Sequence, residues 1–255
     1  MQRLGVIEIL ENTQKVCMSW RRVSNDPAMW RKIVMHKVEG LGYDLEIMCR
    51  HAVDRSQGRL VEIEIWDFAT DSLINYIADR SSKLRSLKLA MCRQISEEEL
   101  TKALVKLPFL EEIELLYGSF SGESLKVVGH ACPNLKTFKL NDRGFYPRLV
   151  SDDDEALSIA ETMHDTGLNA ILDNCPNLEH LDLRQCFNVN IVGDLEKRCS
   201  ERIKVLRHPD DSTHDYPYDA TVIDMRDFQL TDGDMLDLRD FAYELLRYDS
   251  YLSDY

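Results

Sequence analysis

The amino-acid sequence predicts an α/β solenoid in which a short strand and a helix alternate along the chain. A phrase of spaced apolar residues, Leu-x-x-Leu-x-Leu with Ile or Phe substitutions, recurs along the sequence. Its leading residues stand at positions 60, 84, 110, 135, 178 and 203, at intervals of 24, 26, 25, 43 and 25. The helical half also recurs, because Ala131-Cys-Pro-Asn134 and Asn174-Cys-Pro-Asn177 each stand just before a new phrase. A near-constant period of this length is the signature of a stacked repeat architecture.

The clearest copy of the phrase runs from Leu178 to Val189 and matches the leucine-rich-repeat template. Leu181 and Leu183 alternate with Asp182, so a strand would point both leucines to one face and the aspartate to the other. Cys186 stands where the template has a small, weakly polar residue buried in the turn. We therefore predict a Cys-containing leucine-rich-repeat solenoid over residues 57–206.

Composition narrows the class of protein. The chain has 255 residues, a formal net charge of -14 and 44% hydrophobic residues. Such a charge argues against nucleic acid or an anionic membrane as the main partner. Neither an 18-residue apolar run nor a signal peptide stands out, so we expect a soluble protein of the nucleus and/or cytoplasm.

Seven cysteines are present, and we expect those at repeat positions to be buried thiols without disulfides: Cys92, Cys132, Cys175, Cys186 and Cys199. No C-x2-C pair occurs, so we expect no metal site, and we expect no cofactor.

Residues 1–40 are predicted to be helical. Their apolar residues have helical spacing up to Ile33, which indicates two or three short helices and no strand. Asp26 as N-cap with Pro27 at the first helical position marks one helix start. A further helix within 41–56 is predicted to bridge this part to the repeats and to cover the open end of the first one.

The run from Val16 to Val23, V-C-x-x-W in its first half, is followed by Asp26-Pro-Ala-Met-Trp30. This arrangement resembles the second half of an F-box, and an F-box ahead of Cys-type repeats resembles the plant F-box/LRR-repeat (SKIP-like) proteins. The family's opening Leu-Pro and acidic segment has no counterpart before Leu4, so we expect a partial, N-terminally truncated F-box. We also expect it to bind its adaptor weakly or not at all when alone, and expect that a Leu-Pro and acidic helix grafted onto Met1 restores binding.

The resemblance implies a non-enzymatic substrate-recognition subunit of an SCF ubiquitin ligase. The F-box would hold a Skp-family adaptor, and through it cullin, while the repeats hold a protein destined for degradation. The residues that match the family's apolar pattern, some as core and some facing the adaptor, are Ile9, Leu10, Val16, Cys17, Trp20 and Trp30. The alternatives are a non-catalytic scaffold or decoy that does not engage the adaptor, and a plain helical cap on a solenoid.

Side chains between the strand leucines should face the concave surface, because narrow strands line the inside of a curved stack. The candidate substrate-binding residues there are Glu64, Trp66, Lys88, Glu114, Lys139, Asp182 and Arg184. Alternating acidic and basic rungs fit a charged protein segment, and Trp66 is the expected anchor. The competing interpretation is that these residues are simply solvated strand faces.

Two regions depart from the repeat. The 43-residue interval suggests a repeat that has lost its strand, with helices at 152–163 and 166–174, a bulge at His164-Asp165 and a disturbed sheet. Residues 207–255 form an acidic tail, with a disordered linker over 207–219. A following amphipathic helix from Thr231, with Met235, Leu238 and Phe241 on its stripe, is predicted to cap the last repeat or bind a partner. No catalytic constellation appears, so we expect no enzyme activity.

Overall fold

The structure is a computed structural model that describes residues 5–37, 42–92, 94–116, 120–141, 166–186, 189 and 191–216. The chain divides into two compact units, Met1–Ser212 and Thr213–Tyr255. All the helices and strands named below belong to the first unit.

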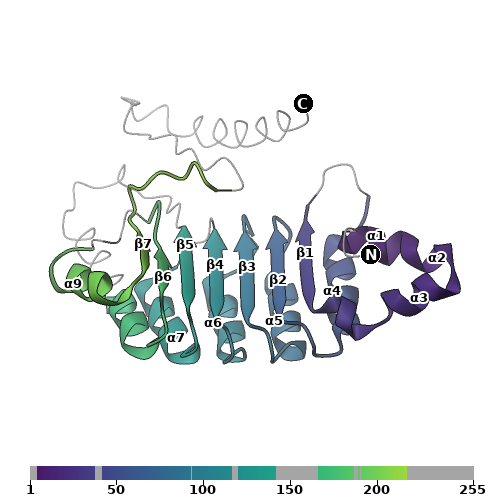
Figure 1. Ribbon diagram of the computed structural model, residues 1–255, viewed down its shortest axis with the longest axis horizontal. Coiled ribbons are helices and arrows are strands. Elements are labelled where there is room, and N and C mark those ends of the chain that lie inside the picture. Colours follow the sequence, from purple (N-terminus) through teal and green to yellow (C-terminus); the bar gives the residue numbers. More distant parts are fainter. Residues whose placement is uncertain are drawn as a thin grey trace. The chain divides into compact units, whose positions relative to one another are not determined.

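A parallel sheet of seven strands forms the centre of this unit, with the strands side by side in chain order (Figure 1). The strands are β1 (Lys32–His36), β2 (Glu62–Trp66), β3 (Ser86–Ala90), β4 (Glu112–Leu116), β5 (Thr137–Asn141), β6 (His180–Asp182) and β7 (Val205–Arg207). The leucine phrases thus become β2 to β7, which confirms the repeat prediction. They stack in strict register, so that Ile63, Leu87 and Ile113 lie opposite one another.

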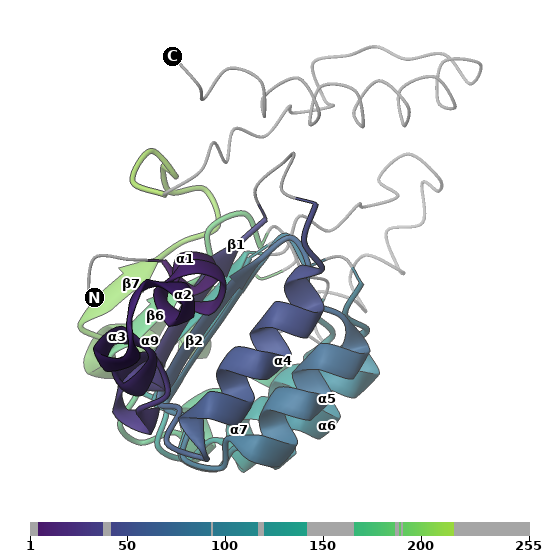
Figure 2. The ribbon, with the colours of Figure 1, turned by 90° about the vertical axis from the view of Figure 1, so that its right-hand side faces the viewer.

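Helices cover one face of the sheet (Figure 2). They are α4 (Leu45–Ser56), α5 (Asp71–Arg80), α6 (Glu97–Val105), α7 (Gly122–Ala131), the helical residues 166–174, and α9 (Gly193–Arg202). The side chains of Asp44, Thr70, Ser96 and Ser121 each accept a hydrogen bond from the backbone N–H three residues on. These caps satisfy backbone donors that the first helical turn leaves without a partner.

The capping-box sequence from Ser96 to Glu99 forms only one of its two hydrogen bonds. The Ser96 hydroxyl caps the Glu99 N–H, but the Glu99 carboxylate accepts from Asn75 of the preceding helix. The Ser96 N–H donates instead to Asp71, at 2.6 Å. Consecutive helices are therefore tied to each other at their N-termini.

Thiols of the repeat turns are buried, as predicted. Cys186 Sγ donates to the carbonyl of Leu140 at 3.1 Å, and Cys175 Sγ to that of Cys132 at 3.4 Å. Burial raises the pKa of the Cys132 thiol to about 12. All seven cysteines lie in the described residues and are free thiols, but Cys92 is only half-buried.

The expectation that residues 1–40 contain no strand is wrong. Lys32–His36 is β1, and it pairs with β2 from Lys32 opposite Glu62 to His36 opposite Trp66. Ile33 and Met35 are buried while the residues between them face the other side, which is the period of a strand. The predicted bridging helix is correspondingly α4, the helix of the first strand–helix unit, packed beside α5.

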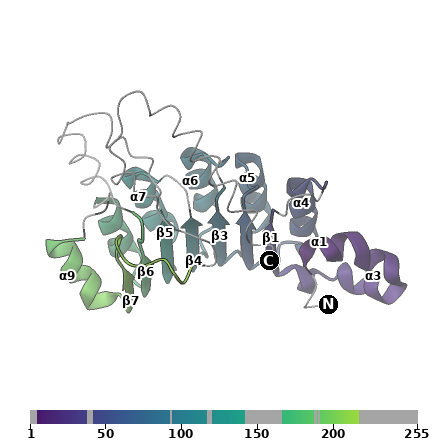
Figure 3. The same cartoon turned by 90° about the horizontal axis from the view of Figure 1, so that it is seen from above.

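Short helices precede β1 and extend beyond it (Figure 3). They are α1 (Val6–Glu8), a π-helical turn η1 (Ile9–Thr13), α2 (Gln14–Val16), α3 (Met18–Ser24) and a 3-10 turn η2 (Pro27–Trp30). Asp26 caps η2 by accepting from the Ala28 N–H at 2.9 Å, as the Asp-Pro pair predicts. The helix predicted to start at Asp26 is therefore a single 3-10 turn, Pro27–Trp30.

The long interval between repeats does not disturb the sheet. β5 pairs directly with β6, with Thr137 opposite His180 and Phe138 opposite Leu181, so this part of the expectation is wrong. The helix predicted at 166–174 is present and packs closely on α7. A Cβ at Gly167 would lie 2.6 Å from the Gly122 carbonyl oxygen, so glycine is needed for this approach. The helix at 152–163 and the bulge at 164–165 lie outside the described residues.

The prediction of a disordered linker from residue 207 is also wrong for the first residues of that segment. Arg207 ends β7, and its carbonyl accepts from the Leu183 N–H at 3.0 Å. Gln185 N–H then donates to the carbonyl of Pro209 at 2.8 Å. Backbone hydrogen bonds to the last repeat thus fix a stretch that has few aliphatic residues. The amphipathic helix predicted from Thr231 lies outside the described residues.

Candidate protein-interaction surfaces

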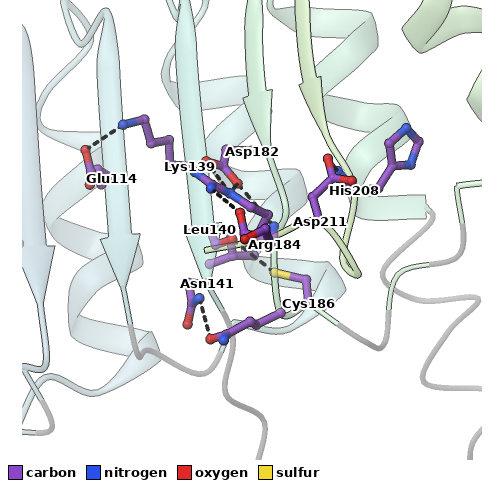
Figure 4. Close-up of polar contacts among 11 residues, drawn as sticks. Glu114, Lys139, Leu140, Asn141, Asp182, Arg184, Cys186, His208 and Asp211 are labelled. Carbon is purple, nitrogen blue, oxygen red and sulfur yellow. Dashed lines mark hydrogen bonds and ion pairs between the residues drawn. The ribbon is translucent and has the colours of Figure 1, made fainter. Parts of the chain in front are cut away.

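The middle of the uncovered sheet face carries a ladder of opposite charges. Lys88 Nζ lies 3.0 Å from Glu112 and 3.8 Å from Glu114 on the next strand. Lys139 Nζ approaches Glu114 from the other side, at 3.3 Å (Figure 4). The predicted alternation of acidic and basic rungs is confirmed, and its effect is mutual neutralisation across strands.

Burial and pairing act in opposite directions on the pKa values of the charged groups in this ladder. Burial alone would raise the pKa of Glu112, but the Ser86 hydroxyl, 2.7 Å away, and the Lys88 ammonium hold that pKa below its ordinary value. Burial would likewise lower the pKa of Lys88, but Glu112 raises it. Both groups are therefore charged around neutral pH, and a ligand must compete with the pairs they already form.

Trp66 lies at the β1 end of this face and has a partner that the sequence analysis missed. Its indole stacks on the His36 ring, with centroids 4.5 Å apart and the planes at 27°. Trp66 Nε1 donates to Glu64 at 3.0 Å, and His36 Nε2 lies 3.3 Å from the same carboxylate oxygen. Buried residues alternate with less buried ones from Lys32 to His36, which is the pattern of a strand. The helical spacing of the apolar residues just before Lys32 makes this short pattern difficult to recognise in the sequence.

Asp182 and Arg184 are not an accessible pair, which corrects their prediction as substrate-binding residues. Their side chains are 9% and 4% exposed, and Arg184 Nη2 lies 2.7 Å from Asp182 Oδ2 (Figure 4). Arg184 Nη1 donates to the carbonyl of Ser212 at 2.7 Å. β6 ends at Asp182 and Gln185 has a φ of 67°, so Arg184 belongs to a turn that folds back over the strand end.

The C-terminal ends of β3, β4 and β5, next to the ladder, are likewise covered and not accessible to a partner. Ala90, Leu116 and Asn141, which alternation places on the concave side, are all buried. Asn141 Nδ2 donates to Gln185 Oε1 at 2.8 Å (Figure 4). The accessible part of the face therefore includes the half-buried charged residues Glu64, Lys88, Glu114 and Lys139, together with Trp66.

The six N-terminal residues predicted to bind an adaptor divide between core and surface. Trp30 is 1% exposed and Ile9 7%, so these two are the core members of the predicted set, and neither side chain is available to a partner. Trp30 Nε1 donates to the Ser24 carbonyl at 2.8 Å. Leu10 is half-buried, while Cys17 is exposed.

Exposed apolar side chains gather on α2 and α3. Val16 is 61% exposed and Trp20 38%, as the prediction requires. Met18 at 78% and Val23 at 43% join them, although neither was singled out as a contact residue. Exposed apolar residues concentrated in one short segment are a common mark of an interaction site. We call Val16, Met18, Trp20 and Val23 the α2–α3 surface.

Other types of site were sought within the described ranges. Those residues contain no group of three His, Cys, Asp or Glu side chains placed to hold a metal ion. Among the same residues, no helix combines the length and the apolar character that a bilayer crossing requires.

Comparison with known proteins decides the family. A scan against protein-family models finds no match. A curated relative, F-box protein SKIP19 of Arabidopsis thaliana, is 60% identical over 250 residues, covering 88% of this chain and 81% of that protein. The chain belongs to the F-box/LRR-repeat family.

Two further relatives of this F-box/LRR-repeat chain come from Arabidopsis thaliana. Putative F-box/LRR-repeat protein 23 is 56% identical over 82% of the chain and 51% of its own length. Putative F-box/LRR-repeat protein 22 is 52% identical over 85% of the chain and 75% of its own length. A solved structure of the Rad7 and Elc1 complex in yeast matches 82% of this chain and 58% of that one. Its TM-score of 0.44 and identity of 14% are too low to identify a function.

Proposed function

We propose that this F-box/LRR-repeat protein is a substrate-recognition subunit of an SCF-type (Skp–cullin–F-box) ubiquitin ligase. The observation that supports it best is the α2–α3 surface, which lies within the F-box-like motif of a chain 60% identical to a named F-box protein. A Skp-family adaptor would dock on this surface and bring cullin with it. The chain itself performs no chemistry, because ubiquitin transfer belongs to the other subunits.

The adaptor would bury side chains that are poorly explained otherwise. Met18 and Trp20 lie on the seven-residue helix α3, and both are open to solvent. Protein interfaces are enriched in Trp and Met, since large side chains bury much area in a fitted groove. The buried Trp30 supports this role, because its Nε1 donates to the carbonyl of Ser24, the last residue of α3.

The target protein would bind the accessible ladder on the concave face. Each charge there already has a partner, so a bound segment gains little from a simple ion pair. Trp66 is the side chain that can contribute apolar contact next to the ladder, and it is held in place by His36 and Glu64. We therefore propose Trp66 as the anchor for the target, with Glu64, Lys88, Glu114 and Lys139 selecting its charge pattern.

Adaptor capture tests the first half of this function. The chain is purified with a Skp-family adaptor, as wild type and as Trp20→Ala. Ile47→Ala on α4 is the matched control, because Ile47 is 51% exposed and lies outside the α2–α3 surface. Loss of the adaptor from the Trp20 variant alone supports the proposal, whereas equal recovery from all three proteins rejects the α2–α3 surface.

Target capture separates a ligase subunit from the alternatives. Proteins recovered with the wild-type chain from plant cells should accumulate when the proteasome is inhibited, and they should fall in abundance when the chain is overproduced. Capture of protein partners with no adaptor present would favour the scaffold or decoy function. A fluorescent fusion tests the proposed location in the nucleus and/or cytoplasm.

A further inference from the structure

The segment that carries the α2–α3 surface, residues 14–25, has a charge opposite to that of the rest of the chain. Residues 14–25 contain Lys15, Arg21 and Arg22 and no acidic residue, which gives them a charge of +3. The formal net charge of the whole chain is -14, so the remaining residues carry -17. A local cationic region on so acidic a chain is a feature that needs an explanation.

The two arginines are free to act on a partner. Arg21 and Arg22 are both exposed, and neither forms an ion pair with any residue that the structure describes. Lys15 has a loose contact to Glu11, at 3.7 Å between two solvent-exposed groups. Most other cations of the repeats are paired, as Lys88 and Lys139 are.

The cations lie beside the exposed apolar residues. Residues three or four positions apart share one side of a helix, so Met18 has Arg21 and Arg22 as its neighbours on α3. Long cationic side chains next to an apolar anchor form the usual rim of a protein interface. Charge on such a rim acts mainly on the rate of association, and buried anchors act mainly on dissociation.

We infer that the partner of the α2–α3 surface has an apolar groove rimmed by carboxylates, and that Arg21 and Arg22 steer this partner into place. The inference rests on the proposed function where that partner is the Skp-family adaptor. The rest of the chain repels an acidic partner, and the two arginines supply a short-range attraction that outweighs this repulsion within about one Debye length, roughly 10 Å.

The test measures association and dissociation rates with purified Skp-family adaptor for the full chain. Arg21→Glu with Arg22→Glu reverses the local charge, and Lys83→Glu with Lys197→Glu is the matched control. The control residues are exposed, lie outside the α2–α3 surface and change the net charge by the same amount. Arg21→Gln with Arg22→Gln removes the charge but keeps long helix-forming side chains, which guards against a variant that fails to fold.

At low salt, we expect the reversed variant to associate about tenfold or more slowly than wild type, with dissociation changed less than about threefold. The Gln variant should fall between them, and the control should stay within about twofold of wild type. The difference between reversed variant and wild type should shrink as salt is raised towards about 0.5 M, because screening removes steering.

Each other outcome overturns the inference in its own way. Normal binding with equal association rates in every variant leaves the proposed function standing and rejects steering by the arginines. An equal slowing of reversed variant and control assigns the effect to net charge. Failure of the wild type to bind the adaptor, even with a Leu-Pro and acidic helix grafted onto Met1, rejects both proposals. Arginine-dependent binding to phosphatidylserine vesicles, with adaptor rates unchanged, would assign the surface to a lipid membrane.

Discussion

Replacing Asp182 by alanine should destabilise the protein by about 3 to 5 kcal/mol, because it leaves the Arg184 guanidinium buried without its counter-charge. The two side chains are 9% and 4% exposed. Arg184 donates to Asp182 through Nε at 3.0 Å and through Nη2 at 2.7 Å. The Arg184 backbone N–H adds a further bond to the same carboxylate, at 3.2 Å.

The magnitude depends on the unpaired charge, and a double variant tests that directly. Asp182→Leu with Arg184→Met removes both charges and keeps apolar volume, so it should be far milder than Asp182→Ala. It still loses the bond from Arg184 Nη1 to the Ser212 carbonyl, which is worth about 1 kcal/mol. Glu64→Ala is the control on the accessible part of the face and should cost less than about 1 kcal/mol.

Urea unfolding followed by far-ultraviolet circular dichroism measures these free energies, and an unchanged slope against urea confirms that the same surface unfolds in each variant. A loss below about 1 kcal/mol for Asp182→Ala would refute the reasoning, since it would mean that Arg184 turns out into solvent once its partner is gone. An effect of that variant on target capture without any effect on stability would restore Asp182 to the binding face.

Three further predictions concern other groups. Trp66→Ala should weaken capture of the target by more than about 1 kcal/mol with no change in unfolding midpoint, and unchanged capture in a pull-down would remove Trp66 from the site. The lowered pKa of Glu112 contributes stability above pH about 4.5 that is lost as pH falls through the lower folded-state value. Ser86→Ala should therefore reduce the acid dependence of the unfolding free energy seen in denaturant titrations at several pH values. Maleimide should label exposed Cys17 in the native protein but not Cys49, whose pKa burial raises to about 12, and mass spectrometry of the labelled peptides would show the opposite if this is wrong.

The repeats could be predicted from sequence because several local signals agree. Large aliphatic residues with period two give the strands, and capping residues such as Thr70 and Ser121 mark the helix starts. The constant spacing fixes which strands are neighbours, since each unit buries its apolar face only against the next. Fold and concave face follow from these signals without any long-range information.

The first strand could not be assigned in this way. Lys32–His36 follows directly after the 3-10 turn that ends at Trp30, so its apolar residues extend a helical pattern. What makes it a strand is pairing with β2, and residues 37–61 separate the two strands. Tertiary pairing overrides local preference here, as β-propensity generally allows.

The end of β6 illustrates a second limit. Alternation predicts that Asp182 and Arg184 face the same side, and the structure agrees on Asp182, but alternation has no means of showing where a strand stops. The turn at Gln185 and the backbone bond to Pro209 decide that Arg184 is covered. Burial of this pair depends on residues 207–212, whose composition gave no sign of ordered packing.

The two tryptophans of the F-box-like motif occupy different environments, one in the core and one exposed. Trp30 is held in η2 by the Asp26 cap and by its own bond to the Ser24 carbonyl, with the Arg55 guanidinium 5.4 Å from its ring. Ser24 is the last residue of α3, so Trp30 fixes the end of that helix against α4. Trp20 lies on the same helix, α3, and can then face solvent at a defined place. An aromatic anchor binds well only if its position is set before the partner arrives, because ordering it afterwards costs free energy.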